Sequence, residues 1–119
     1  MPNASFEDAV CLRKDYELEV LLSKHRDYGP KNIADSPGGA LNGLRVRLHD
    51  KLARLNNLVD SGASPEHEGL IDTALDIANY GTIMALVLSG HWPGAEVPTA
   101  KDGPATQGTV SISGTVETW

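Results

Sequence analysis

The sequence has one cysteine, few aromatic residues and no excess of positive charge, and each shortage excludes a class of protein. Cys11 is alone in 119 residues, so an intrachain disulfide is impossible and a reducing compartment is the simple expectation. Lysine and arginine number 10 against 16 aspartates and glutamates, which gives a formal net charge of -6. A protein that grips nucleic-acid phosphates needs a broad basic surface, so direct nucleic-acid binding is not expected.

The sequence also lacks a recognisable signal peptide and a long hydrophobic run. The first ten residues include Glu7 and Asp8 and no apolar stretch. The apolar run from Ile83 to Leu88 is far short of a membrane span. We therefore expect a cytoplasmic protein with no membrane partner. One Phe, two Trp and three Tyr leave a single core to be built mostly from aliphatic residues, and small helical proteins of this kind often complete such a core by oligomerising.

Apolar periodicity and capping residues predict three long helices. The first runs from about Phe6 to His25, with Ser5 as its N-cap. The second runs from about Leu41 to Val59, where apolar residues three and four apart form one core stripe. The third runs from Pro65 to Ser89, because Ser64 followed by proline is a strong helix start.

The remaining segments are predicted to be loop or tail. Residues 31–40 contain Pro and Gly and are expected to form a loop. Residues 1–94 form the expected domain, and residues 95–119 form a tail rich in Pro, Gly and Thr, with a weak strand signal over residues 109–119. The predicted fold is an all-α bundle of three to four helices, oligomeric, with an extended or weakly β C-terminal tail.

The acids inside the third helix share one narrow stripe. At about 100° per residue, Glu68, Asp72 and Asp76 span roughly 80° of the circumference. The rest of the helix is mostly apolar or small, so we expect it to be buried. Two carboxylates about 6 Å apart repel by roughly 3 kcal/mol at an effective dielectric of 20, so such acids need protons, Lys or Arg partners, or a shared cation. Oxygen ligands suit Mg²⁺ or Mn²⁺, so one interpretation is that the three acids hold such a cation. The alternative interpretation is that they form a solvated stripe on a surface helix.

A cationic row lies beside the core stripe of the second helix. It consists of Arg47, Lys51 and Arg54, with Asp50 among them. The short connection makes the second and third helices antiparallel neighbours, so this row can face the acids. Two interpretations stay open: an interhelical salt-bridge network, or acids that hold Mg²⁺ while the cations hold the phosphates of an anionic ligand.

Three segments in combination resemble a known family. They are His25-Arg26-Asp27-Tyr28-Gly29, the run Arg-Leu-His-Asp-Lys-Leu-Ala-Arg-Leu at 47–55, and Glu68 followed by Asp-Thr-Ala-Leu-Asp-Ile-Ala-Asn-Tyr at 72–80. Together they resemble the nucleotide modification associated domain type 1, grouped with the MazG-like all-α nucleoside triphosphate pyrophosphatases and common in phage genomes. The resemblance covers about residues 21–88. It implies a helical bundle that assembles as a dimer or tetramer and hydrolyses a nucleotide to a monophosphate and pyrophosphate with Mg²⁺.

The resemblance assigns roles to the acids and cations. Glu68, Asp72 and Asp76 would hold the metal, with Asp50 as a fourth ligand. Alternatively, Glu68 would orient the attacking water instead of binding the metal. Lys51 joins Glu68 and Asp72 as a predicted catalytic residue. The full set expected to bind substrate is Arg47, Lys51 and Arg54 on phosphate, Asn79 and Tyr80 on sugar or base, and Lys24, Tyr28 and Asn32 at the mouth of the bundle.

Two function classes follow, with a third behind them. The first is a Mg²⁺-dependent nucleoside triphosphate pyrophosphohydrolase, placed in the host cytoplasm if the chain is phage-encoded. The second is a phage-type protein that binds or sequesters a nucleotide without cleaving it, favoured because Lys51, Arg54 and Thr73 stand where related proteins commonly have paired acids. The third is a structural oligomer whose buried ion network fixes helix register. The four histidines are expected to be surface or capping groups.

Overall fold

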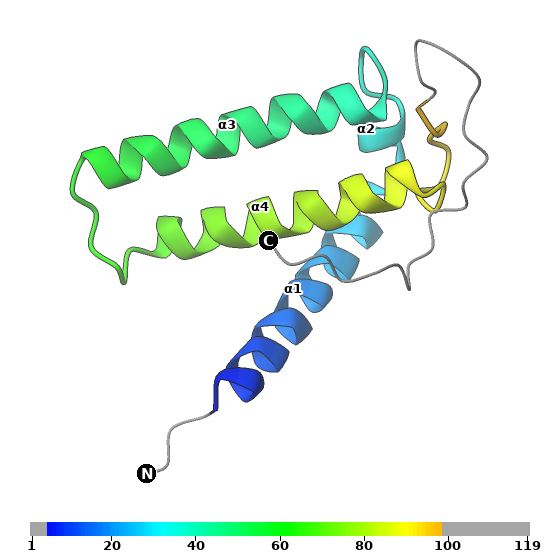
Figure 1. Cartoon of the computed structure of the whole chain (residues 1–119). Helices are drawn as coiled ribbons and strands as arrows, with labels where there is room; N and C mark the ends of the chain where they lie inside the picture. Colours follow the sequence, from blue (N-terminus) through cyan, green and yellow to red (C-terminus); the bar gives the residue numbers. More distant parts are fainter. Residues whose placement is uncertain (1–4, 99–119) are drawn as a thin grey trace.

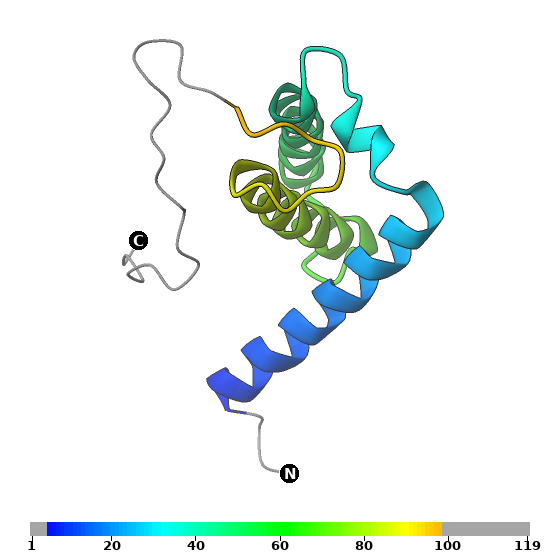
Figure 2. The same cartoon turned by 90° about the vertical axis from the view of Figure 1, so that its right-hand side faces the viewer.

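The computed structural model describes residues 5–98, and every regular element in that range is helical. The elements are α1 (Phe6–Tyr28), α2 (Lys31–Ala34), α3 (Ala40–Asp60) and α4 (Glu68–Leu88). Helices α3 and α4 lie side by side as an antiparallel hairpin, and α1 crosses α4 and then projects away from the pair (Figures 1 and 2). The predicted all-α fold is confirmed; the expected strand at 109–119 lies outside the described residues.

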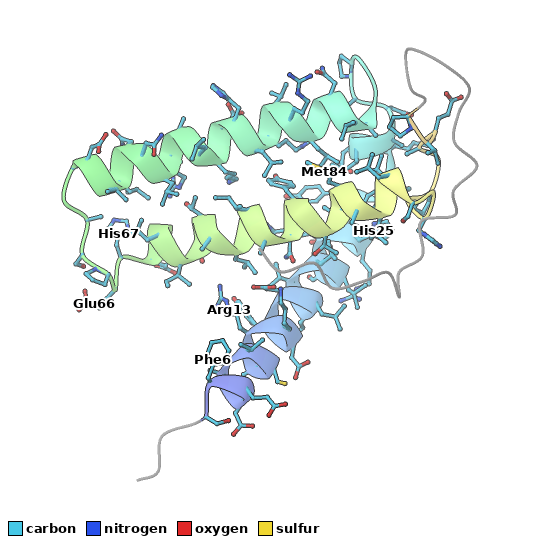
Figure 3. All side chains as sticks on the ribbon, viewed as in Figure 1. Phe6, Arg13, His25, Glu66, His67 and Met84 are labelled. Atoms are coloured by element: carbon cyan, nitrogen blue, oxygen red, sulfur yellow. The ribbon has the colours of Figure 1, made fainter. Side chains whose placement is uncertain are left out.

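Helix α1 begins where its capping residue predicts. The Ser5 hydroxyl accepts a hydrogen bond from the Asp8 N–H at 3.1 Å. The helix ends at Tyr28, three residues later than expected, because Gly29 adopts a φ of 71° that favours glycine and donates its N–H to the His25 carbonyl at 2.8 Å. None of the residues of α1 is fully buried, and Phe6 at its outer end is 86% exposed, away from the hairpin (Figure 3).

The segment predicted as a loop contains the short helix α2. This helical turn forms because it buries the side chain of Ile33, which is 3% exposed and belongs to the core. Gly43 of α3 lets this segment approach, since a Cβ atom at position 43 would collide with the side chain of Ser36. The loop prediction for residues 31–40 is therefore wrong over residues 31–34, where one buried isoleucine outweighs the neighbouring breakers.

Helix α4 starts later than the serine–proline signal predicts. Residues 64–67 form a turn in which the His67 N–H donates to the Ser64 carbonyl at 2.8 Å. His67 is the N-cap, and its ring Nδ1 accepts from the Gly69 N–H at 2.9 Å. The predicted start at Pro65 is wrong, because Pro65 belongs to this turn and not to the helix. The expectation that the histidines are surface or capping groups is confirmed for His67.

The core lies at the open end of the hairpin, where α2 and the segment after α4 pack against the start of α3 and the end of α4. It consists of Ile33, Ala40, Leu44, Ile83, Val87 and Trp92. Only the first part of the predicted leucine stripe enters it: Leu44 is fully buried, whereas Leu52 and Val59 are 52% and 58% exposed. Helix α1 does not extend along the half of the hairpin next to the connection at residues 61–67. No third described helix therefore covers Leu52 and Val59.

Helix α4 is apolar but is not buried all round, so the expectation of a buried helix is wrong for one of its faces. Ile71 and Leu88 are 49% and 42% exposed. By length and composition alone, α4 is long and apolar enough to cross a membrane. Core helices of soluble proteins meet the same criterion, so it does not decide localisation.

The close approach at Gly43 gives the first testable prediction. Gly43→Ala should lower the free energy of unfolding by about 1–3 kcal/mol, because the added methyl group must push Ser36 and α2 away from α3. Urea unfolding followed by circular dichroism measures this. The matched control is Gly81→Ala in α4, where a Cβ meets nothing within 4 Å and helix propensity should stabilise the protein by about 0.5–1 kcal/mol. Equal effects of the two substitutions would contradict the packing argument.

Candidate functional site

A cavity of about 360 Å³ opens where α1, α2, α3, α4 and the segment after α4 meet. It is lined by Leu21, Lys24, His25, Tyr28, Gly29, Asn32, Ile33, Arg47, Lys51, Asp76, Asn79, Tyr80, Ile83 and Trp92. The antiparallel hairpin brings Lys51 of α3 opposite Asp76 of α4, as the short connection predicts. The crossing of α1 then adds Lys24 from the other side.

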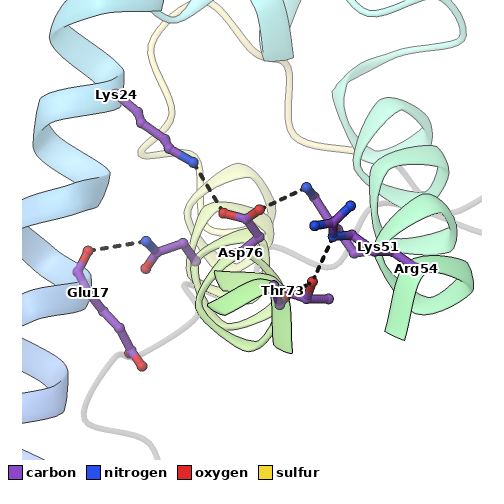
Figure 4. A network of polar contacts seen from close by, with 8 residues as sticks. Glu17, Lys24, Lys51, Arg54, Thr73 and Asp76 are labelled. Carbon is purple, nitrogen blue, oxygen red and sulfur yellow. Dashed lines mark hydrogen bonds and ion pairs between the residues drawn. The ribbon is translucent and has the colours of Figure 1, made fainter. Parts of the chain in front are cut away.

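Asp76 is the centre of the polar contacts in this cavity. Its carboxylate accepts a hydrogen bond from Lys24 Nζ at 3.1 Å and forms an ion pair with Lys51 Nζ at 2.8 Å (Figure 4). The Asp76 side chain is 18% exposed, Lys51 is 29% exposed and Lys24 is 54% exposed. One carboxylate therefore joins three helices, and Lys24 is its more solvated partner.

The two lysines also determine how Asp76 titrates. Burial by itself raises the pKa of the Asp76 carboxyl, but the hydrogen bonds and charges of Lys51 and Lys24 outweigh it, so the pKa lies below its ordinary value. A lowered pKa in the folded state means that the carboxylate stabilises the fold in full above the unfolded pKa. This contribution is lost as the pH falls through the folded pKa.

Arg47 holds α2 against α3 at the rim of the cavity. Its guanidinium donates to the Asn32 carbonyl at 2.8 Å and to the Ser36 hydroxyl at 3.3 Å. These two contacts fix the guanidinium beside the cavity without a carboxylate partner among the described residues. Its positive charge is therefore not neutralised by an ion pair in this part of the chain.

Arg54, which belongs to the same predicted row, has a different place. Its Nε donates to the Thr73 hydroxyl at 3.2 Å, and Thr73 in turn donates to the Gly69 carbonyl at 2.6 Å (Figure 4). Arg54 does not line the cavity. It joins α3 to α4 one turn further out, so the structure separates it from the predicted substrate-binding group.

The predicted metal ligands are not brought together. Asp50, Glu68 and Asp72 are exposed and lie outside the cavity, whereas Asp76 lines it. Within residues 5–98, no three His, Cys, Asp or Glu side chains are grouped so that they could hold a metal ion. Glu68 and Asp72 therefore match the solvated stripe, the alternative interpretation of this helix, and the Mg²⁺ site stays a prediction.

The predicted substrate-binding residues, by contrast, mostly meet in the cavity. Lys24, Tyr28, Asn32, Arg47, Lys51, Asn79 and Tyr80 all line it, and Arg54 is the exception. Asn79 is 8% exposed and donates to the Glu17 carbonyl at 3.2 Å, which ties α4 to α1. Tyr28 is 67% exposed at the rim, and Tyr80 packs partly against the core.

Two aromatic side chains that line the cavity, His25 and Trp92, were not predicted from the sequence. His25 was expected at the surface, but its ring is half-buried and meets the Trp92 ring edge to face, with centroids 5.1 Å apart. Among residues 5–98, no group forms a hydrogen bond with the buried His25 Nδ1, whereas Trp92 Nε1 donates to the Pro30 carbonyl at 3.1 Å. The signal was available in α1, where Leu21, Lys24, His25 and Tyr28 have helical spacing and share one face. Trp92 follows α4 in a segment without periodicity, so nothing in the sequence placed it.

Charge distinguishes this cavity from the rest of the chain. Lys24, Arg47 and Lys51 carry three positive charges, and Asp76 is the single acid among the lining residues. Three cations less one carboxylate leave an excess of two positive charges, in a chain whose formal net charge is -6. A concave site with this excess favours an anionic ligand.

Comparisons of the chain with family models, with curated proteins and with solved structures give no match. The site is therefore defined by its own geometry.

The Asp76 contacts give the second prediction. Asp76→Asn should lower the free energy of unfolding by about 1–2 kcal/mol at neutral pH, because both lysines lose a charged partner at a partly buried position. The difference in free energy of unfolding between the wild-type protein and Asp76→Asn should disappear below roughly pH 4, because the Asp76 carboxylate takes up a proton there. Denaturant unfolding at a series of pH values measures both. Asp72→Asn, an exposed acid one turn away, should change little, and a difference between wild type and Asp76→Asn that persists unchanged in acid would refute the assignment.

Proposed function

We propose that this protein binds a nucleotide in the cavity, with the phosphates against Lys24, Lys51 and Arg47. The observation that carries the proposal is the local excess of two positive charges in a concave site of an acidic chain. Anions are attracted to a positive cleft with low-dielectric walls, and the acidic remainder of the surface repels them. An anion would therefore concentrate at this site.

The three cations have donors to spare. Each lysine ammonium has three N–H groups, and one group on each meets Asp76. The guanidinium of Arg47 has five N–H groups, of which two are used by Asn32 and Ser36. Phosphate oxygens can accept the rest without displacing a structural contact, and charge-assisted hydrogen bonds of this kind are the strong ones.

The other lining groups suit the remainder of a nucleotide. Tyr28, Tyr80 and Trp92 supply ring surfaces, and Asn32 and Asn79 supply amides that read hydroxyl groups and ring edges. A volume of about 360 Å³ lies in the range of small-molecule sites. The resemblance to nucleotide pyrophosphatases supports the same ligand class.

The second candidate is hydrolysis of a nucleoside triphosphate to a monophosphate and pyrophosphate with Mg²⁺ or Mn²⁺. The observation that favours it is the position of Asp76 inside the cavity, one helical turn from Asp72 and two turns from Glu68. The described acids do not form a ready cation site, since Asp76 is paired with two lysines and Asp50, Glu68 and Asp72 are exposed. We derive no catalytic step from this arrangement and place binding first.

The binding proposal makes a prediction about Lys51. Lys51→Ala should weaken binding of a nucleoside triphosphate, measured by calorimetry with EDTA present, by about tenfold, because one charge-assisted phosphate contact is lost. The matched control is Arg45→Ala, an exposed cation of the same helix that does not line this cavity. It should leave the affinity within about twofold. Equal losses in the two variants would show nonspecific attraction, and no binding by any of the common nucleotides would contradict the proposal.

The variant Asp72→Asn distinguishes a protein that hydrolyses a nucleotide from one that only binds it. If the chain cleaves nucleotides, wild-type protein with Mg²⁺ should release pyrophosphate, and Asp72→Asn should lose at least about tenfold in rate while keeping its affinity in EDTA. If the chain only binds, the nucleotide should be recovered intact from both proteins. We expect intact recovery, because Asp72 is exposed and outside the cavity. Pyrophosphate in the wild-type reaction, lost in Asp72→Asn, would reverse the order of the two candidates.

A further inference from the structure

The three cations that line the cavity, Lys24, Arg47 and Lys51, are gathered around one point and are named here the cation cluster. Lys24 Nζ lies 3.1 Å from one oxygen of Asp76, and Lys51 Nζ lies 2.8 Å from the other (Figure 4). The two ammonium groups are therefore separated by no more than one carboxylate and two short contacts. Arg47 stands four residues before Lys51 on α3, and Cβ atoms at this spacing are about 5–6 Å apart. The positive charges are clustered and not spread along a groove.

No further cation extends the cluster along the cavity. Among the described residues that line the cavity, no other is Lys or Arg. The next cation along α3, Arg54, donates to the Thr73 hydroxyl and lies outside the cavity. The rest of the wall is largely apolar or aromatic and includes Ile33, Ile83 and Trp92. A chain of two or three phosphoryl groups would therefore extend beyond the cluster over surfaces that offer no positive partner.

Asp76 limits the negative charge that the cluster can accept. Its carboxylate is 18% exposed and lies between two of the three cations, so it balances one of their charges. The remaining excess of two positive charges matches a phosphomonoester, which carries about two negative charges at pH 7 and presents its acceptor oxygens on one phosphorus. Each further phosphoryl group adds negative charge near Asp76 that no lining Lys or Arg balances.

The size of the cavity favours the same ligand. Its volume of about 360 Å³ is near the lower end of the range of small-molecule sites, roughly 300–1,000 Å³. A base and sugar against the aromatic wall would take up much of this volume. A ligand with a short anionic group therefore fits better than one with a long phosphate chain.

We propose that the cavity selects a nucleoside monophosphate over the corresponding diphosphate and triphosphate, and that Asp76 determines this selection. The inference rests on the proposed nucleotide binding and specifies its ligand. Asp76 acts through its charge: it occupies one donor on each lysine and repels added phosphoryl groups. This role is opposite to that of a metal ligand, which would bring Mg²⁺ to a triphosphate and strengthen its binding.

Calorimetry with the full chain tests the selection. Nucleoside mono-, di- and triphosphates of the common bases are titrated near neutral pH in EDTA, so that no divalent cation neutralises the phosphates. The monophosphate should bind at least about tenfold tighter than the triphosphate of the same base, with the diphosphate between them. The cyclic monophosphate has the same base and sugar but only one charge. It should bind about tenfold more weakly than the monophosphate, because one charge-assisted contact is lost.

The possible results separate this inference from the proposed function. Affinity that rises with the number of phosphoryl groups would overturn the inference and leave nucleotide binding intact. Ribose phosphate or inorganic phosphate that binds as tightly as the nucleoside monophosphate would overturn both, because the base would then contribute nothing. A chain that binds none of these ligands would also overturn both.

The variant Asp76→Asn tests the role of the carboxylate. It leaves three positive charges in the cavity and frees a donor on each lysine, so triphosphate affinity should rise by at least about threefold relative to monophosphate affinity. The matched control is Asp60→Asn, which removes the same charge from an exposed acid at the far end of α3, outside the cavity. It should leave the ratio of the two affinities within about twofold of the wild-type ratio.

Circular dichroism of both variants shows whether they are folded. If Asp76→Asn is unfolded, the wild-type titrations still decide whether the cavity selects a monophosphate. An unchanged ratio in folded Asp76→Asn would overturn the role of Asp76. Weaker binding of the triphosphate by Asp76→Asn than by the wild type, with Mg²⁺ present, would overturn it as well and favour a metal ligand.

Discussion

The structure depends on one carboxylate held by two ammonium groups. Asp76 of α4 meets Lys51 of α3 and Lys24 of α1, so it is shared by the three long helices at the point where they converge (Figure 4). The apolar core fixes the open end of the hairpin through residues such as Leu44 and Val87. It does not by itself orient α1, since that helix has no fully buried residue. The direction of α1 is set by two polar contacts, Lys24 with Asp76 and Asn79 with the Glu17 carbonyl, together with the packing of Leu21 on the core and of His25 on Trp92.

The helices were predictable where local chemistry and packing agree. The Ser5 hydroxyl binds the Asp8 N–H through a local contact that needs no distant residue, so this cap could be predicted from the sequence. The start of α4 was misread because serine and proline favour a turn as readily as a helix start, and the tertiary structure gives the cap to His67. The α2 turn depends on burial of Ile33, which is decided by residues distant in the sequence. The leucine stripe of α3 follows the predicted pattern, but two residues of its second half, Leu52 and Val59, are more than half exposed.

The candidate site was predictable in part for a similar reason. Helical spacing and a short connection were enough to place Lys51 opposite Asp76, because both follow from the geometry of one hairpin. Helical spacing could not show that the acid stripe drifts out of the cavity along α4, nor that a distant lysine reaches Asp76. That second cation changes the chemistry: an acid that already has two partners no longer needs a metal ion to be tolerated. The expected partner exists for Asp76, where it is a pair of lysines, whereas Glu68 and Asp72 are exposed to solvent.

The same cluster that holds α1 also faces the cavity, so the proposed binding of an anionic ligand would be linked to the position of α1. A phosphate that takes the free N–H groups of Lys24 and Lys51 adds negative charge next to Asp76, and the two lysines then serve two anions at once. Lys24 is the more exposed of the two and belongs to α1, which has no fully buried residue, so it moves at least cost if the anions repel. Asn79 limits that movement, since its amide still binds the Glu17 carbonyl seven residues before Lys24. The mobile response to a ligand should therefore be confined to the last turns of α1, between Glu17 and Gly29, where Tyr28 and His25 also face the cavity.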